Sequence, residues 1–157
     1  MIDPAELMQL AIETCREGIA QGQSPFGCAI AVGDRVISRA HNTVLHSTDI
    51  TAHAEVNAIR LGCQATGNIF LSEAVVATTC EPCPMCMAAL HWARVKTVYY
   101  GATIADADGA GFNELQLPAS ELLRIGGSGV KLVGGLLKDE CVELFELWNA
   151  NPTKVAY

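Results

Sequence analysis

The chain has 157 residues, of which half are apolar and 17% are charged, and its formal net charge is −7. A chain of this length can bury about two-thirds of the surface that its unfolded form exposes, so we expect one domain spanning residues 1–157. No apolar run approaches the ~20 residues of a membrane-spanning helix, so we expect no membrane span. The 17 acidic and 10 basic residues include no basic run, which argues against a nucleic-acid partner.

The N-terminal segment predicts a reducing compartment for the cysteines. The first ten residues lack the basic and apolar regions of a secretory signal, so we expect a cytoplasmic protein. In the cytoplasm, clustered cysteines are more often metal ligands or redox groups than disulfides. Three of the seven cysteines lie in the segment CEPCPMC, residues 80–86.

The N-terminal segment predicts a helix followed by a β-hairpin. Asp3 suits an N-cap, Pro4 suits the first helical position, and Gly22 is expected to end this helix. Apolar runs at residues 26–32 and 35–42 flank a two-residue turn, as in a β-hairpin.

The rest of the chain alternates between helix and strand patterns. We expect helices at residues 51–62, 82–95 and 137–150 and strands at residues 74–79, 96–103 and 129–134. The stretch 106–123 predicts irregular structure with one short helix, and the tail 151–157 lies outside any regular element. This order predicts a three-layer α/β/α fold around a five-stranded mixed sheet.

Two motifs supply groups that could bind a metal. Cys83 and Cys86 share one face at the start of a predicted helix, where the helix dipole favours thiolates. His53 and Glu55 begin another predicted helix upstream. The set His53, Cys83 and Cys86 offers three ligands and leaves a fourth position for water, which is the pattern of a catalytic zinc site. Glu55 is then the candidate proton shuttle.

Three other interpretations of these residues stay open. Adding Cys80 gives a closed structural zinc site, which leaves Glu55 without a role. Cys83 and Cys86 also match a dithiol oxidoreductase motif, although such a motif does not require the histidine and glutamate. In the third interpretation, His53 and Glu55 are ordinary helix-cap and surface residues. Outside the ligand set, Cys80 is expected to be a small buried apolar residue.

Together the motifs match a known signature. Residues 53–55 (HAE) and 82–86 (PCPMC) fit the H-x-E and P-C-x-x-C pattern of zinc nucleobase deaminases. With SPFGCAIA, HNTV, TAHAEVNAIR, TTCEPCPMCMAALHWAR and GAGFNE, most of the chain resembles the cytidine deaminase superfamily, and within it the bacterial guanine deaminases. The resemblance implies a cytidine deaminase-like fold, one Zn²⁺ per chain and hydrolysis of a free purine base, with guanine giving xanthine and ammonia. Backbone N–H groups near Glu81 and Cys83 are expected to stabilise charge on the attacking oxygen.

The resemblance also places residues against the base. Asn42 matches an asparagine that hydrogen-bonds the base, although its position after a strand also suits a turn. Phe26 matches an aromatic residue that packs on the base, and it equally suits the core. Trp92 matches a tryptophan that lines the guanine site, although a lone tryptophan on an apolar face is as often a core residue. Ala54 is expected to contribute its backbone.

Two further contacts are expected near the C-terminus. Residues 111–114 (GFNE) stand where guanine deaminases carry GFDD, an acidic pair that contacts the guanine amidine edge. Here the pair is Asn113 and Glu114, so one acid remains with a longer side chain, and guanine specificity stays open. Tyr157 ends a tail, residues 149–157, that either frays or closes over the active site, with or without a swap in a homodimer.

The nearest alternative function is that of a tRNA-specific adenosine deaminase, which shares the zinc motifs and the asparagine. The acidic composition and the lack of a basic tail favour a small-molecule nucleobase. Because residues 111–114 read GFNE where guanine deaminases carry GFDD, cytosine, guanosine and isoguanine also remain candidate substrates. Outside the hydrolases, a zinc-binding module without catalysis and a dithiol oxidoreductase remain open.

Overall fold

The computed structural model describes all 157 residues. Its elements in chain order are α1 (Pro4–Ala20), β1 (Gly27–Val32), β2 (Arg35–His41), α2 (Val44–Ser47), α3 (Ala54–Thr66), β3 (Ala74–Cys80), α4 (Pro84–Trp92), β4 (Thr97–Ala102), α5 (Ile104–Gly109), α6 (Ala119–Gly126), β5 (Lys131–Gly134) and α7 (Lys138–Asn149). No helix combines the length and the apolar composition needed to cross a membrane.

The five strands form one mixed sheet in the order β2-β1-β3-β4-β5. Strand β1 is antiparallel to both β2 and β3, whereas β3, β4 and β5 run parallel. Gly33 adopts a φ of 63° between β1 and β2, the left-handed conformation that the hairpin turn requires. The predicted hairpin and the predicted five-stranded mixed sheet are therefore confirmed.

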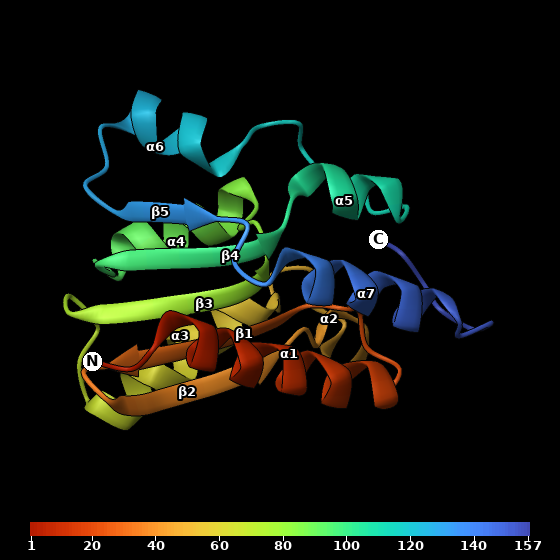
Figure 1. The fold of residues 1–157 in the computed structure, drawn as a ribbon, viewed down its shortest axis with the longest axis horizontal. Helices are drawn as coiled ribbons and strands as arrows, with labels where there is room; N and C mark the ends of the chain where they lie inside the picture. The colour runs from red at the N-terminus through yellow and green to blue at the C-terminus, as the bar shows by residue number, and fades with distance from the viewer.

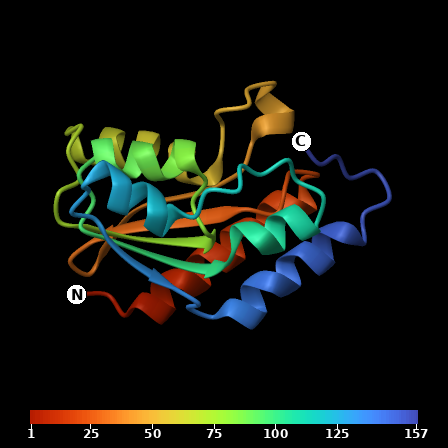
Figure 2. The same ribbon diagram turned by 90° about the horizontal axis from the view of Figure 1, so that it is seen from above.

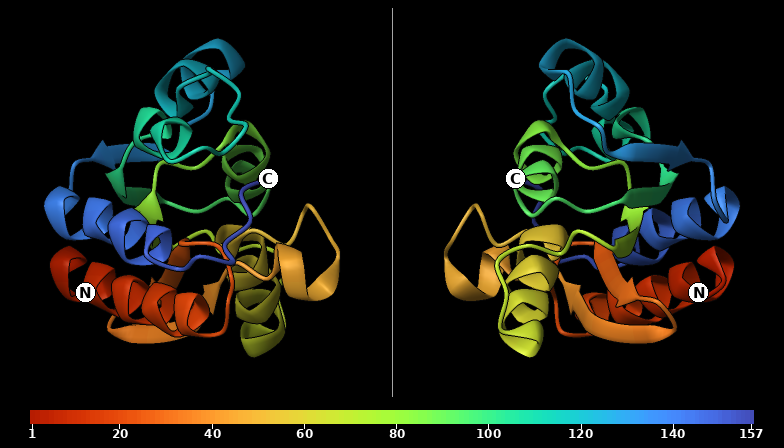
Figure 3. Two further views of the ribbon diagram at one scale, coloured as in Figure 1. Left: turned by 90° about the vertical axis from the view of Figure 1, so that its right-hand side faces the viewer. Right: turned by 90° about the vertical axis from the view of Figure 1, so that its left-hand side faces the viewer.

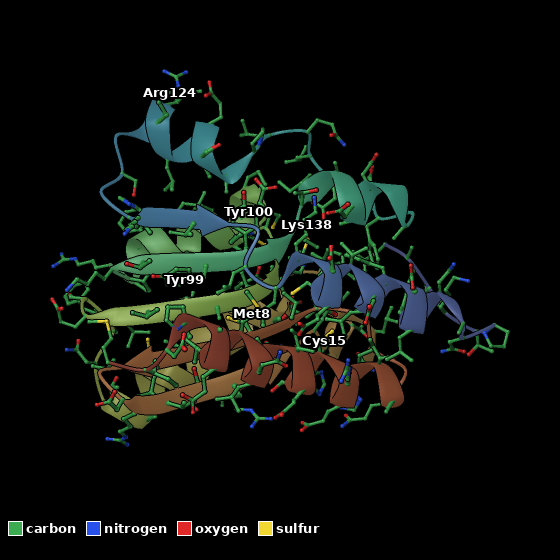
Figure 4. All side chains as sticks on the ribbon, viewed as in Figure 1. Met8, Cys15, Tyr99, Tyr100, Arg124 and Lys138 are labelled. Carbon is green, nitrogen blue, oxygen red and sulfur yellow. The ribbon has the colours of Figure 1, made fainter.

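Helices cover both faces of the sheet. Helices α1 and α7 lie on one face, and α3 and α4 lie on the other (Figures 1 and 2). Each face has its own buried apolar cluster. Met8 and Cys15 of α1 belong to the cluster on the α1 and α7 face (Figure 4), and neither side chain is exposed to solvent. The predicted three-layer α/β/α arrangement is confirmed.

The sheet topology brings the starts of α3 and α4 together. Both helices cover the same face, and α4 follows directly from the carboxyl end of β3. Helix α2 stands out from the layers on the α3 side of the molecule (Figures 2 and 3). This corner of the molecule carries the residues that the sequence motifs singled out.

Several boundaries differ from the sequence prediction. Helix α3 continues past Gly62 and ends at Thr66, followed by the C-cap residue Gly67, whose φ of 65° is typical of that position. A Cβ at Gly62 would lie 3.3 Å from Ile37 of β2, so this glycine allows close helix-to-sheet packing and does not stop the helix. The stretch 106–123 contains parts of two helices, α5 and α6, and the four-residue α2 was not predicted.

Candidate active site

His53 and Cys83 hold equivalent positions at the starts of α3 and α4. Each is the N-cap residue of its helix with an extended backbone, and neither side chain caps its own helix. An N-cap side chain ordinarily accepts a hydrogen bond from the first helical turn. Because these two side chains do not, the imidazole and the thiol are free to point at a common position. Cys86, in the first turn of α4, completes the group.

The spacing of these three side chains fits a single zinc ion. Nδ1 of His53 lies 3.7 Å from Sγ of Cys83 and 3.4 Å from Sγ of Cys86. All three candidate ligand atoms lie within 4.8 Å of one another. Tetrahedral zinc with bonds of ~2.3 Å to sulfur and ~2.0 Å to nitrogen places such ligands about 3.5 Å apart. The residues present therefore fit the metal that the motifs predict.

The two thiols are electrostatically unequal without a metal. The pKa of Cys83 is lowered to about 4, chiefly by a hydrogen bond with Cys86 and also by the nearby His53, against the opposing effect of burial. The same hydrogen bond, followed by burial, raises the pKa of Cys86. One thiolate is therefore already present at neutral pH, and metal binding would displace the proton of the second thiol.

Cys80 does not belong to this group. Its thiol donates to the carbonyl oxygen of Thr103 at 3.4 Å, and the side chain is 4% exposed. Burial raises the pKa of Cys80, followed by the charge of Glu55, which keeps the thiol protonated. Cys80 packs in the apolar cluster with α1 and α7, as expected for a small buried apolar residue. The geometry thus disfavours the closed four-ligand site.

Glu55 lies beside the three candidate ligands. Its side chain is 6% exposed, and Oε1 accepts a hydrogen bond from Oγ1 of Thr78 on β3 at 3.2 Å. Burial raises the pKa of Glu55, and the charge of Cys83 raises it further. A buried carboxyl with a raised pKa suits proton transfer near neutral pH.

Two hollows meet at this position. An inner cavity of about 20 Å³ is lined by Phe26, His53, Glu55, Cys80, Glu81, Cys83, Glu114 and Tyr157. An outer cleft of about 270 Å³ is lined by Ile50, His53, Cys83, Pro84, Met85, Phe112, Asn113, Glu114, Leu115 and Tyr157. His53, Cys83, Glu114 and Tyr157 line both hollows. Apart from the candidate ligand His53, no basic side chain lines either one.

Tyr157 places the end of the tail over its own chain's cavity. Nδ2 of Asn42 donates a hydrogen bond to the Tyr157 hydroxyl, and the Tyr157 carbonyl accepts from the Asn113 backbone N–H at 3.0 Å. The Tyr157 ring lies 5.6 Å from the ring of His53. Figure 2 shows the tail leaving α7 and turning back toward α2. The tail therefore contacts the site of its own chain.

The expected base contacts occupy different environments. Asn42 is fully buried, and its Oδ1 accepts a hydrogen bond from the Val44 backbone N–H at 3.0 Å. This contact matches the alternative interpretation of Asn42 as a residue that stabilises a turn after a strand. Phe26 lines the inner cavity and packs edge-to-face against Phe112, with ring centroids 5.0 Å apart. Ala54 is fully buried in the cluster beneath α3, so its side chain packs in the core.

Glu114 lies where its carboxyl can reach both hollows. The side chain is half-buried, and burial, followed by the charge of Cys83, raises its pKa to about 7. A carboxyl that titrates near neutral pH can donate as well as accept a hydrogen bond there. Asn113, the other member of the pair, is exposed and uses its backbone N–H to hold Tyr157.

Two expectations need correction. Trp92 does not line the site of its own chain: its indole is 78% exposed and faces another hollow, beside Phe70. The reason is that α4 begins at the candidate ligands and ends at Trp92, which lies nearly two turns beyond Cys86 on another face. The backbone N–H of Glu81 is also engaged, since it donates to the Ala102 carbonyl at 2.8 Å, and so does not face an attacking oxygen.

Sequence reasoning missed the roles of two side chains of the site. Thr78 orients Glu55, and its place in an apolar strand gave no signal of that contact. The Glu81 side chain lines the inner cavity and accepts two backbone hydrogen bonds from distant segments. Its place between Cys80 and Pro82 in the motif was the only available hint.

Comparisons with known proteins agree with this geometry. Residues 1–102 match the family model described as the cytidine and deoxycytidylate deaminase zinc-binding region. The chain is 41% identical over 121 residues to a guanine deaminase of Bacillus subtilis (strain 168), covering 73% of this chain and 78% of the relative. It is 38% identical over 102 residues to a tRNA-specific adenosine deaminase of Agrobacterium fabrum, covering 65% of this chain and 67% of the relative.

A solved structure extends the match beyond residue 102. The guanine deaminase from Nitrosomonas europaea superposes with a TM-score of 0.88 at 26% identity, covering 96% of this chain and 87% of that one. The matched family region includes both zinc motifs of this chain. The chain therefore belongs to the cytidine and deoxycytidylate deaminase family and is a zinc-dependent hydrolytic deaminase.

Proposed function

We propose that the chain deaminates a free purine base, with guanine hydrolysed to xanthine and ammonia as its main reaction. Residues 1–157 then act as a single deaminase domain. The observation that carries the proposal is the inner cavity, where Glu55 and Glu114, both with raised pKa values, lie with the candidate zinc ligands His53 and Cys83. The guanine deaminases among the relatives support the choice of base.

The cleft favours a small neutral substrate over a polynucleotide. Proteins that hold nucleic acids do so chiefly through lysine and arginine contacts with phosphates. The outer cleft contains neither residue type, and Ile50, Met85 and Leu115 give it an apolar rim. Tyr157 also lines this cleft. A tRNA-specific adenosine deaminase remains the second candidate, because one relative carries that activity at 38% identity.

We assign the roles of metal ligands to His53, Cys83 and Cys86 and that of proton shuttle to Glu55. When bound, zinc supplies a hydroxide nucleophile at neutral pH, because it lowers the pKa of water toward ~7. Oε1 of Glu55 is held by Thr78, so we assign proton transfer to Oε2. This oxygen takes one proton from the attacking water and passes it to a ring nitrogen. It then takes the second proton of the same water and passes it to the amino group, which leaves as ammonia.

The remaining side chains would orient the base. We propose that Phe26 packs on its face and that Asn42 hydrogen-bonds its edge, exchanging its present partner Tyr157 for the base. Glu114 would contact the edge that carries the amino group. The tail 149–157 would then close the site after the base enters.

The seven cysteines are all free, which supports a cytoplasmic location.

The ligand assignment is tested by zinc content. Cys86→Ala or His53→Ala should reduce bound zinc from one per chain to near zero, because two ligands hold the ion poorly. Cys80→Ala is the matched control and should keep its zinc, since the Cys80 thiol lies outside the group. Metal analysis of the purified variants measures this. Full zinc occupancy in Cys86→Ala would remove that residue from the ligand set.

The reaction is tested by ammonia release. We expect guanine to be the best substrate in a panel with adenine, cytosine, guanosine, isoguanine and an adenosine-bearing anticodon stem-loop. Glu55→Gln keeps the shape of the side chain but cannot accept a proton, so activity should fall by about 100-fold or more while zinc is retained. Turnover of the stem-loop alone would shift the function to the second candidate. Undiminished activity in Glu55→Gln would refute the shuttle assignment.

We also propose a homodimer that buries the exposed apolar surface around Trp92. Ile69 and Phe70 lie on the same hollow and are 70% and 38% exposed. Exposed apolar groups that gather in one place commonly mark protein interfaces.

A charge in this surface should disrupt the dimer. Trp92→Glu should give a monomer by light scattering at a concentration where the unaltered protein is a dimer. Leu147→Glu is the control, because Leu147 of α7 is 48% exposed outside this surface. A monomeric unaltered protein, or a dimeric Trp92→Glu variant, would contradict the proposed interface.

The pKa of Glu114 predicts a pH effect on the zinc-free protein. A carboxyl whose pKa rises from 4.5 to about 7 on folding binds more protons when folded. Its stabilising contribution is therefore full below pH 4.5 and is lost as the pH rises to about 7. Glu114→Gln removes this loss. The Tm of the variant minus the Tm of the unaltered protein should therefore be about 2–4 °C greater at pH 7.5 than at pH 5, allowing for partial solvent screening. The same Tm difference between the two proteins at both pH values would refute the assignment.

A further inference from the structure

The carboxylate of Glu81 holds the first residues of two helices at once. Its Oε2 accepts from the Ile104 backbone N–H at 3.0 Å, and its Oε1 accepts from the Ala119 backbone N–H at 2.9 Å. Ile104 begins α5 and Ala119 begins α6. Both oxygens of one side chain are therefore committed to backbone groups far away in the sequence.

Neither helix can satisfy these N–H groups from its own N-cap. The first N–H groups of a helix have no partner within the helix. Helix α6 has Pro118 as its N-cap, and no side chain caps it locally. In α5, the Thr103 hydroxyl accepts from the Asp106 N–H, which leaves the Ile104 N–H for Glu81. A negative charge is also favourable at the N-terminal end of a helix.

The chain between these two points carries part of the candidate active site. Residues 110–118 contain no helix or strand, and Phe112, Asn113 and Glu114 lie within them. Phe112 packs against Phe26, and the Asn113 N–H holds Tyr157. Glu114 lines the inner cavity. An irregular segment of this kind depends on its ends for its position.

Glu81 joins both ends to the loop that carries the candidate zinc ligands. It follows Cys80, the last residue of β3, and precedes Pro82 and the ligand Cys83. Its own backbone N–H donates to Ala102 at the end of β4. Through one side chain, the zinc loop and both ends of the segment 104–119 are fixed to the same point.

We propose that Glu81 is a positioning residue that sets the place of Glu114 relative to the zinc ligands by capping α5 and α6 together. The inference rests on the proposed substrate role of Glu114. A carboxylate is required because two acceptor oxygens must meet two N–H donors. Glutamine offers only one acceptor oxygen, and its amide NH₂ would face the other donor.

The catalytic part is tested with zinc-loaded protein and the best substrate of the ammonia-release panel. Glu81→Gln should lower kcat/KM by about tenfold or more, since it breaks one charge-assisted hydrogen bond and opposes two donors, and zinc content should not change. In a Glu114→Ala background, the same change should cost less than about threefold, because coupled residues are not additive. Glu73→Gln is the control: Glu73 is exposed, pairs with Lys96 and should change neither background.

The anchoring part is tested by hydrogen exchange on the same zinc-loaded proteins. In Glu81→Gln, amides in residues 104–119 should exchange about tenfold faster, and in Glu73→Gln they should not change. Unchanged exchange in Glu81→Gln would overturn the anchoring. Loss of zinc from Glu81→Gln, or an equal cost of the change in both backgrounds, would show that Glu81 does not act through Glu114.

These results separate the inference from the proposed function. A chain without activity on any panel member refutes the proposed function, and the exchange data alone then decide whether Glu81 anchors the segment. If Glu114→Ala retains full activity, the catalytic part of the inference fails together with the role of Glu114. Faster exchange with non-additive kinetics supports both.

Discussion

The meeting of two helix starts at one corner of the sheet is the constraint on which the site depends. His53 and Cys83 are the N-cap residues of α3 and α4, yet neither caps its helix, and their side chains meet within 3.7 Å. Both helices cover the same sheet face, and α4 leaves directly from the end of β3. Cys86 and Glu55 lie within the first turns of these helices, so the fold brings them to the same point.

This arrangement places two acidic side chains, at least partly buried, beside the candidate zinc ligands. Glu55 and Glu114 both have raised pKa values because burial disfavours their charged forms, and the charge of Cys83 adds to the effect. A bound divalent cation offsets such a cost, because it attracts the same carboxylates that repel the thiolate. The segment that carries Glu114 lacks regular structure and is fixed by contacts from elsewhere, including Glu81, Phe26 and Tyr157.

Patterns in short stretches of the sequence predicted the features that depend on residues close together in the chain. The spacing of Cys83 and Cys86 on a helix start, the histidine motif and the order of strands and helices predicted the metal group, and the structure confirms the sheet and its layers. The prediction for Trp92 was wrong because this residue lies at the opposite end of α4 from the candidate zinc ligands, although it is close to the motif in the sequence. The double contact of Glu81 joins residues far apart in the sequence, so no local pattern could show it.

Zinc-edge X-ray absorption of the purified holoprotein tests the central claim most directly. The account predicts one four-coordinate zinc with two sulfur neighbours at ~2.3 Å and two nitrogen or oxygen neighbours at ~2.0–2.2 Å, one of them exchangeable. Three sulfur neighbours would place Cys80 in the coordination sphere and make the site a closed structural one. That result would contradict the open metal site on which the proposed chemistry of Glu55 depends.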